Sequence, residues 1–300
     1  MAAVVRAGQT SVSILSYLVL QQNISSGSVW TFFKSPNNAK PYRCVQFERD
    51  MPYNYERMVR IITDAILPIL FIFPLTIFCL ENKTQLKTIG LFVVIFVLYQ
   101  ILLVIPIEYK EFNFLKGKWN WTGKIYGIIF GLTMYFSLIK QFKQHKFLRI
   151  KQDNETLNKT IQLSLFPIIF MVLFSISLTS KEFNSETLFF QLTLPGFDEE
   201  IMFRAVLLGL LLTCLKDKIL IGNYNLGNPS VLIIGLLFGL CHGVQVTKKL
   251  NIEFEIIPFI SASSFGYIWS WIAYKSKSIL QPVISHNLSN FFLNLIRMIR

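Results

Sequence analysis

The stretch FDEEIMFR, residues 197–204, decides how the rest of this sequence is interpreted. It places three adjacent acids and one arginine at the head of an apolar run that continues to Leu215. An ionisable group inside a membrane needs a partner or a task, because burying an unpaired charge in lipid is costly. In a helix, Glu200 and Arg204 share one face, with the acid N-terminal to the base, which is the favourable order. Glu199 points about 100° away around the helix, so its partner must come from another segment.

The composition predicts an all-α polytopic membrane protein. The chain has 300 residues, of which 53% are hydrophobic and only 15% are charged. Repeated apolar runs with so little charge exclude an ordinary soluble domain. The formal net charge of +12 does not predict a nucleic-acid partner, because Lys and Arg collect in short connections and form no contiguous basic face. The four cysteines form no Cys-x-x-Cys pair and predict neither a disulfide framework nor a zinc ribbon.

The apolar segments predict about eight transmembrane helices and membrane lipid as a partner. Their order leaves both termini on one side, and the basic residues of alternate loops nearly balance, so the orientation stays open. The remaining N-terminal part, residues 1–60, is expected to be a loop with an interfacial segment. The expected spans are residues 61–80, 89–107, 125–139, 161–178, 188–215, 231–246, 256–274 and 279–299.

The fifth apolar segment is unusual, because Pro195-Gly196 interrupts it just before the acids. If the helix proper begins at Phe197, Glu199 lies near the membrane surface. If residues 188–194 also enter the bilayer, Glu199 lies about 15 Å deep at the helical rise per residue. We favour this placement because it brings the acid level with two histidines in later segments. Asp198 has no evident task, and helix N-capping is its simplest role.

Three histidines occur in the whole chain. His145 belongs to a basic loop and is expected to be solvated. His242 and His286 instead lie inside apolar segments. A single buried histidine is usually structural, but two of them together with Glu199 favour a functional site. His286 and Asn290 are four residues apart and therefore share one helix face.

These residue types suit the attack of water on an amide. A carboxylate and an imidazole, Glu199 and His242, can hold a water molecule and remove its proton. His286 and Asn290 can donate hydrogen bonds to the oxyanion that develops. A metalloprotease would use Glu199, His242 and His286 as ligands of Zn²⁺ instead. The sequence lacks a His-Glu-x-x-His zinc motif, so we favour catalysis without a metal or other cofactor, with Zn²⁺ as the alternative.

Three short motifs now resemble a known family. They are Glu199-Glu200-x-x-x-Arg204, Phe238-x-x-x-His242 and His286-x-x-x-Asn290, in that order on successive late segments. Together they resemble the signature motifs of the CPBP family, the CAAX-protease and bacteriocin-processing (Abi) intramembrane endopeptidases. The resemblance covers about residues 195–300. Each motif alone is weak, whereas all three in order within apolar segments are specific.

The resemblance implies a role for each motif residue. Glu199 and His242 would activate water, and His286 with Asn290 would form the oxyanion site. Structural support would come from Glu200, Arg204 and Phe238. Eukaryotic members of the family resemble glutamate-dependent enzymes, so the resemblance leaves the glutamate-type and metallo-type peptidase open.

The resemblance also implies an organisation for the chain. Residues 61–180 would form four N-terminal transmembrane helices, and residues 181–300 a catalytic core of four helices. The substrate would be a peptide or a lipidated protein, cut three residues from its C-terminus in prenyl-protein processing. The abundance of Lys, Asn, Ile and Phe favours a bacterial cell membrane, and a eukaryotic member would belong in the endoplasmic reticulum.

Two other functions remain open at this point. One is a non-catalytic immunity or scaffold protein of the same fold, although such a protein would not need all four motif side chains. The other is a proton-coupled transporter that uses glutamate and histidine as a relay. We find no internal repeat of the kind that many transporter folds show. The sequence does not predict an oligomeric state.

Overall fold

The computed structural model describes residues 53–225, 227–247 and 249–300. Residues 1–52, most of the predicted N-terminal loop and interfacial segment, lie outside the described residues. The last part of that predicted loop is helical, because the first described helix already begins at Tyr53. The helices are α2 (Tyr53–Phe78), α3 (Leu86–Glu108), α4 (Trp121–Leu138), α5 (Leu157–Ser177), α6 (Ser185–Glu200), η3 (Ile201–Leu207), α7 (Leu208–Leu211), α8 (Pro229–Gly243), α9 (Ile256–Ser276) and α10 (Leu280–Ile299).

Sheet is confined to two small antiparallel hairpins in the described part of the chain. Strands β1 (Leu220–Ile221) and β2 (Tyr224–Asn225) form one, with Leu220 opposite Asn225. Strands β3 (Val244–Val246) and β4 (Ile252–Phe254) form the other, with Gln245 opposite Glu253. Two single-turn 3₁₀ helices, η1 (Lys83–Gln85) and η2 (Lys110–Phe112), flank α3.

Four of these helices, α2, α3, α5 and α9, are long and apolar enough to cross a membrane. Their outer faces carry exposed large apolar side chains such as Phe71 on α2, Val94 on α3 and Leu173 on α5. Apolar side chains on the outside suit lipid and not water, because lipid tails impose no penalty on them. The chain is therefore an all-α membrane protein, as the composition predicts, while eight spans stay a prediction.

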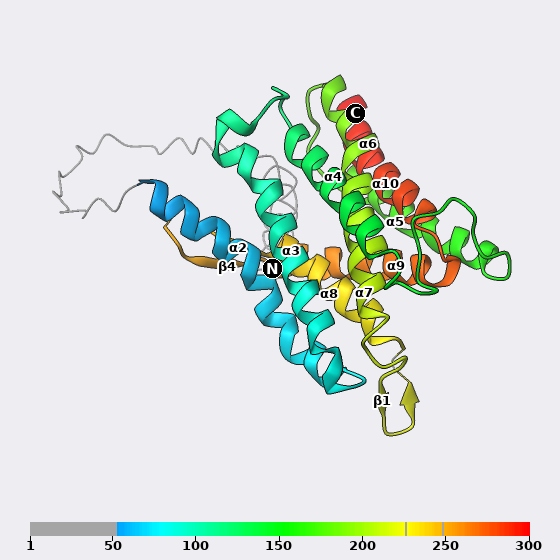
Figure 1. The fold of residues 1–300 in the computed structure, drawn as a ribbon. Helices are drawn as coiled ribbons and strands as arrows, with labels where there is room; N and C mark the ends of the chain where they lie inside the picture. Colours follow the sequence, from blue (N-terminus) through cyan, green and yellow to red (C-terminus); the bar gives the residue numbers. More distant parts are fainter. Residues whose placement is uncertain (1–52, 226, 248) are drawn as a thin grey trace, which may run out of the picture.

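The helices pack as a closed ring (Figure 1). Each contacts the next in the spatial order α2, α3, α4, α6, α10, α5, α9, α8, and α8 closes the ring on α2. The continuation of α6, formed by η3 and α7, contacts α3, α4, α8 and α9 and is enclosed by them. All seven residues of η3 are buried, with at most 2% exposure. The functional segment 197–204 therefore leads from the ring wall into the protein interior.

Helix α6 runs continuously through Pro195-Gly196, so residues 188–194 and Glu199 belong to one helix. A proline inside a helix removes one backbone donor and disturbs the neighbouring hydrogen bonds. The side-chain amide of Asn287, on α10, repairs this disturbance from outside the helix. Its Nδ2 donates to the Thr193 carbonyl at 3.0 Å, and its Oδ1 accepts from the Gly196 amide at 2.8 Å. Backbone groups freed by a proline inside a membrane protein are typically satisfied by a neighbouring helix in this way.

The helix changes its winding directly after the acids. η3 is a π-helix, with wider turns than an α-helix. Such segments are rare and often occur at functional sites. Here the change of winding separates the acidic end of α6 from the apolar α7, and it includes Arg204.

The loop between α4 and α5 corrects the expectation for His145. Its side chain is partly buried and not solvated, with its ring 6.1 Å from that of Phe147. Burial lowers the pKa of His145 from its ordinary value, and nearby Lys277 adds to this effect. A neutral ring in a loop, remote from the acidic segment, is consistent with a packing role.

Candidate active site

Glu200 joins two of the predicted motifs. Its Oε1 accepts from Arg204 Nη1 at 3.0 Å and lies 2.9 Å from His286 Nδ1. Both side chains of the Glu200–Arg204 pair are fully buried. The predicted i,i+4 pair is therefore present, and it also anchors a histidine from α10.

Aromatic rings surround the Arg204 guanidinium. Its central carbon lies 4.7 Å from the centre of the Phe238 ring and 5.6 Å from that of Trp269. Arg204 Nη2 also donates to the carbonyl of Gly266 on α9 at 3.2 Å. A buried guanidinium keeps its charge, so these contacts and Glu200 together compensate for its lost hydration. Phe238 thus packs against both Arg204 and His286, as expected for the structural role that the resemblance implied.

The ring of His286 is held on two sides. Trp269 stacks on it, with centroids 4.2 Å apart and planes inclined by 14°. Phe238 meets it edge-on, with centroids 6.0 Å apart. Trp269 itself is fixed by donation from Nε1 to the Ser285 hydroxyl at 3.1 Å. Sequence reasoning missed Trp269, because an aromatic residue in an apolar helix gives no signal of which side chain it covers.

Glu199 finds its partner on α4. Lys124 Nζ donates to Glu199 Oε1 at 2.6 Å and to Asp198 Oδ2 at 2.9 Å. Asp198 also accepts from the Tyr99 hydroxyl at 2.8 Å. The N-capping role expected for Asp198 is therefore wrong, since it lies near the C-terminal end of α6 and Asn184 caps the helix. Lys124 was missed, although a third helix starting near Trp121 would have placed it in an apolar first turn.

The second oxygen of Glu199 is the reactive candidate. Glu199 Oε2 is buried and has no hydrogen-bond partner among the described residues. It lies 3.8 Å from His286 Nε2. This separation is too long for a direct hydrogen bond, but it allows one water molecule to contact both atoms.

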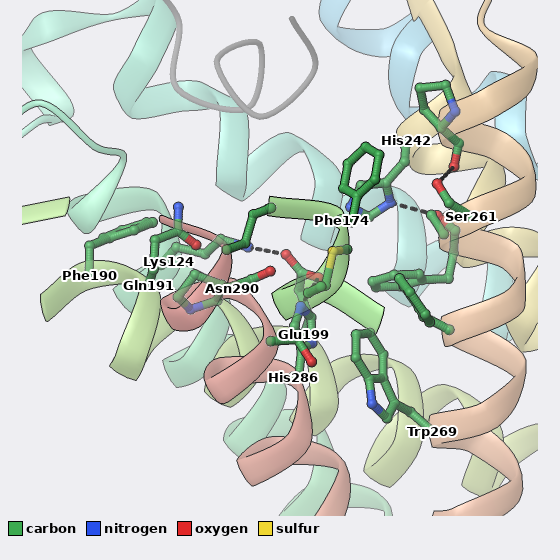
Figure 2. A pocket seen from close by; sticks show the side chains of 18 of the residues that line it. Lys124, Phe174, Phe190, Gln191, Glu199, His242, Ser261, Trp269, His286 and Asn290 are labelled. Atoms are coloured by element: carbon green, nitrogen blue, oxygen red, sulfur yellow. Dashed lines mark hydrogen bonds and ion pairs between the residues drawn. The ribbon is translucent and has the colours of Figure 1, made fainter. Parts of the chain in front are cut away.

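His242 lies at the C-terminal end of α8, facing the same space from the opposite side (Figure 2). Its Nδ1 is 2.7 Å from the Phe238 carbonyl oxygen. A carbonyl only accepts hydrogen bonds, so Nδ1 carries the proton. In the neutral ring, Nε2 is then an acceptor that can take a proton from water.

Two cavities meet at this site. One has a volume of about 200 Å³ and is lined by His286, Asn290 and aromatic side chains that include Phe174, Phe190 and Trp269. The other, about 350 Å³, lies towards α2 and α3 and is lined by several charged side chains. Four residues line both cavities: Asn120, Lys124, Glu199 and His242. The four predicted catalytic side chains therefore gather at one place, although they come from three separate helices.

The donor set does not fit a zinc site as it is arranged. No three His, Cys, Asp or Glu side chains in the described part of the chain converge as metal ligands. A Zn²⁺ ion on Glu199 would lie beside the Lys124 ammonium, and the two cations would repel each other. His286 Nδ1 is already directed at Glu200. No step proposed below passes through a metal.

The fold and the site together define an α-helical membrane protein with a buried site of carboxylate, lysine and histidine side chains. Residues 184–292 match the family model described as type II CAAX prenyl endopeptidase Rce1-like. This match is consistent with the CPBP family that the three motifs resemble. It begins at the N-cap of α6 and contains all three motifs. Comparison with curated proteins and with solved structures gives no match.

Proposed function

We propose that this chain is an integral-membrane endopeptidase that hydrolyses a peptide bond without a metal. Water would be activated by Glu199 and His242, and the oxyanion would be stabilised by His286 and Asn290. The observation that carries this proposal is the unpartnered Glu199 Oε2, which shares a cavity with the other three side chains. The Rce1-like domain supports an endopeptidase of this family.

The proposed chemistry assigns one task to each group. The water oxygen attacks the carbonyl carbon while its proton passes to the Glu199 carboxylate or to the acceptor Nε2 of His242. The carbonyl becomes an oxyanion, which accepts hydrogen bonds from His286 Nε2 and the Asn290 amide. When the C–N bond breaks, the stored proton passes to the leaving amine. Atoms and charge balance without a co-reactant other than water.

The role of His286 sets a condition on its protonation. Its Nδ1 faces a Glu200 oxygen that accepts a hydrogen bond, so Nδ1 carries one proton. Donation to an oxyanion requires a second proton on Nε2, and hence the imidazolium form. His242 acts as an acceptor only when it is neutral.

The two cavities suggest how a substrate would lie. An extended peptide that occupies both cavities would pass Glu199 and His242, which line the junction between them. The aromatic cavity would take the more apolar side of the substrate, and the cavity with charged lining the more polar side. A peptide or a lipidated protein within or beside the membrane is the substrate class that fits.

The test compares wild type with Glu199→Gln on a peptide library in lipid vesicles, with and without a strong chelator. The library includes plain peptides and peptides with S-farnesylated cysteine three residues before the C-terminus. Glutamine keeps the shape of the side chain but cannot accept the proton, so we expect a loss of activity of about 10²- to 10⁴-fold. Chelator should leave the wild type unchanged.

Three outcomes would contradict the proposal. Activity lost with chelator and restored by zinc would establish a metalloprotease. No cleavage of any peptide by well-folded wild type would favour a non-catalytic immunity or scaffold protein. Proton flux that depends on Glu199, measured in the same vesicles, would favour a transporter.

A further inference from the structure

Lys124 is the cation of this site that no motif contains. It lies in the first turn of α4 and outside the matched segment 184–292. Its side chain is 14% exposed, and its ammonium contacts the carboxylates of Glu199 and Asp198. Long-range contacts of this kind, across 75 residues for Glu199, are made only in the folded protein.

A second set of contacts fixes where the lysine ammonium lies. Asp198 is fully buried and is held by the Tyr99 hydroxyl through the same oxygen that binds Lys124. Gly127, one turn after Lys124, allows this approach, because a Cβ there would overlap Asp198 Oδ1. The order of contacts is therefore Tyr99, Asp198, Lys124 and Glu199.

We propose that Lys124 is a positioning residue for the hydrolytic reaction. It holds Glu199 Oε1, so that Oε2 faces the cavity beside His286, and it stabilises the carboxylate as the anion that accepts the proton of water. This inference rests on the proposed endopeptidase function. It adds a residue from the N-terminal half of the chain to a site whose motifs all lie in the C-terminal half.

A purely structural role for Lys124 is the competing explanation, in which it only compensates the buried charge of Asp198. Two observations favour positioning. The ammonium is closer to Glu199 than to Asp198, at 2.6 Å against 2.9 Å. Lys124 also lines both cavities together with Glu199 and His242. A lysine that only neutralised Asp198 could do so without lining either cavity.

Glu199 has other titratable and charged neighbours, so the effect of Lys124 must be separated from theirs. These neighbours lie on α3, α4, α8, α10 and the helical run of Glu199 itself. Lys124 is the one ammonium in direct contact with Glu199 among the described residues. The others are Asp198 and Arg204 on the same helical run, Tyr99 on α3, Cys241 and His242 on α8, and His286 on α10.

The experiment uses four variants of the full chain in lipid vesicles. Lys124→Met removes the charge at similar length, and Lys124→Arg keeps the charge. Lys124→Met combined with Asp198→Asn removes one buried carboxylate as well, which limits the charge imbalance that could prevent folding. Lys140→Met, an exposed lysine just beyond α4, controls for the loss of one positive charge.

The readouts are kcat, KM and the pH dependence of kcat, measured with the best substrate of the farnesylated peptide library. For Lys124→Met and for the double variant, we expect kcat to fall about 100-fold with KM changed less than about threefold. The acidic limb of the pH profile should move to higher pH, because a carboxylate without its cation is protonated more easily. Lys124→Arg should recover part of kcat and the wild-type pH limb, and Lys140→Met should match wild type.

The double variant distinguishes the two roles. If Lys124 only compensates Asp198, the double variant regains both stability and wild-type kcat, and the inference is wrong. An unshifted acidic limb in Lys124→Met would overturn it as well. If Lys124 positions Glu199, the double variant regains stability alone.

A second readout keeps this inference separate from the proposed function. Infrared difference spectra can follow the protonated carboxyl band that Glu199→Gln removes. That band should appear at higher pH in Lys124→Met than in wild type, whether or not any peptide is cleaved. Cleavage failing in wild type would contradict the proposed function alone, whereas a band at the same pH in both proteins would contradict the role of Lys124.

Discussion

The indole of Trp269 lies flat against the imidazole of His286, with ring centroids 4.2 Å apart. This stack fixes the plane of the histidine, while Glu200 fixes the direction of its Nδ1. The remaining nitrogen, Nε2, is then directed towards Glu199 Oε2. An indole on α9 and a carboxylate on α6 therefore orient a histidine on α10.

Replacement of Trp269 tests this orientation. Trp269→Leu removes the aromatic face, so His286 gains freedom to rotate, and we expect kcat to fall about 10- to 100-fold with a small change in KM. Trp269→Phe keeps a stacking face and should retain more activity. Steady-state kinetics with thermal unfolding as a control would check this. Equal loss in both variants would show that the indole acts through something other than its flat face.

Arg204→Ala tests the buried ion pair. The change leaves Glu200 without its cation in the interior, and breaking such a pair costs about 3–5 kcal/mol. We expect a lower unfolding temperature and lower yield, whereas Lys87→Ala, at an exposed position in the first turn of α3, should change little. Unfolding followed by intrinsic fluorescence in detergent would measure both. Normal stability combined with lost activity in Arg204→Ala would assign the arginine to chemistry instead of support.

Gly196→Ala tests the contact between α6 and α10. An added Cβ would lie 2.6 Å from Asn287 Oδ1 and 3.1 Å from His286 Cβ, so α10 would have to move. We expect a loss of about 1–3 kcal/mol from overpacking and reduced activity. Gly90→Ala is the matched control, because a Cβ there meets nothing within 4 Å. A wild-type unfolding temperature for Gly196→Ala would show that the Asn287 contact can be lost without cost.

Lys181, in the loop between α5 and α6, provides a prediction for pH. Burial, together with nearby Arg297 and Lys118, lowers the pKa of Lys181 to about 8 from 10.5. The unfolded chain then binds more protons than the folded one between about pH 8 and 10.5, so this group makes stability rise with pH across that window. Below pH 8, Lys181 is protonated in both the folded and the unfolded protein. The full cost of placing its charge in these surroundings then lowers the stability of the folded protein.

Lys181→Met should therefore stabilise the protein at pH 7, and its advantage over wild type should shrink as the pH rises above 8. Unfolding temperatures at pH 7 and pH 9.5 would measure the difference. The exposed Lys116→Met is the control for loss of charge and should show no such trend. A constant difference between wild type and Lys181→Met at both pH values would contradict the assignment.

The spacing of residues along the sequence was sufficient to predict part of this site. The Glu200–Arg204 pair was predictable because residues four apart meet on any helix. The apolar segments predicted the helices, because lipid leaves the backbone few other ways to satisfy its hydrogen bonds. The order of the three motifs predicted a family resemblance, and residues 184–292 match the Rce1-like family model. The acid and the two histidines of the motifs line one cavity.

Other features depended on contacts between distant segments. The sequence left two possible starts for the helix around Pro195-Gly196. In the structure α6 runs through both residues, and the amide of Asn287, 91 residues away from Gly196, bonds to its backbone. Asp198 looked like a capping residue until Tyr99 and Lys124 were found beside it. The periodicity of one segment does not predict which side chains of other helices will contact it, because helix packing decides which faces meet.

The sequence by itself determined that this is a helical membrane protein, which motif residues it carries and which acid pairs with Arg204. These properties follow from hydrophobicity and from the fixed period of a helix. Only the tertiary structure decided that Lys124 holds Glu199 and that Trp269 orients His286. The reason is physical: a buried charge takes its partner from whichever helix packs against it, and that neighbour is set by the closure of the whole helical ring.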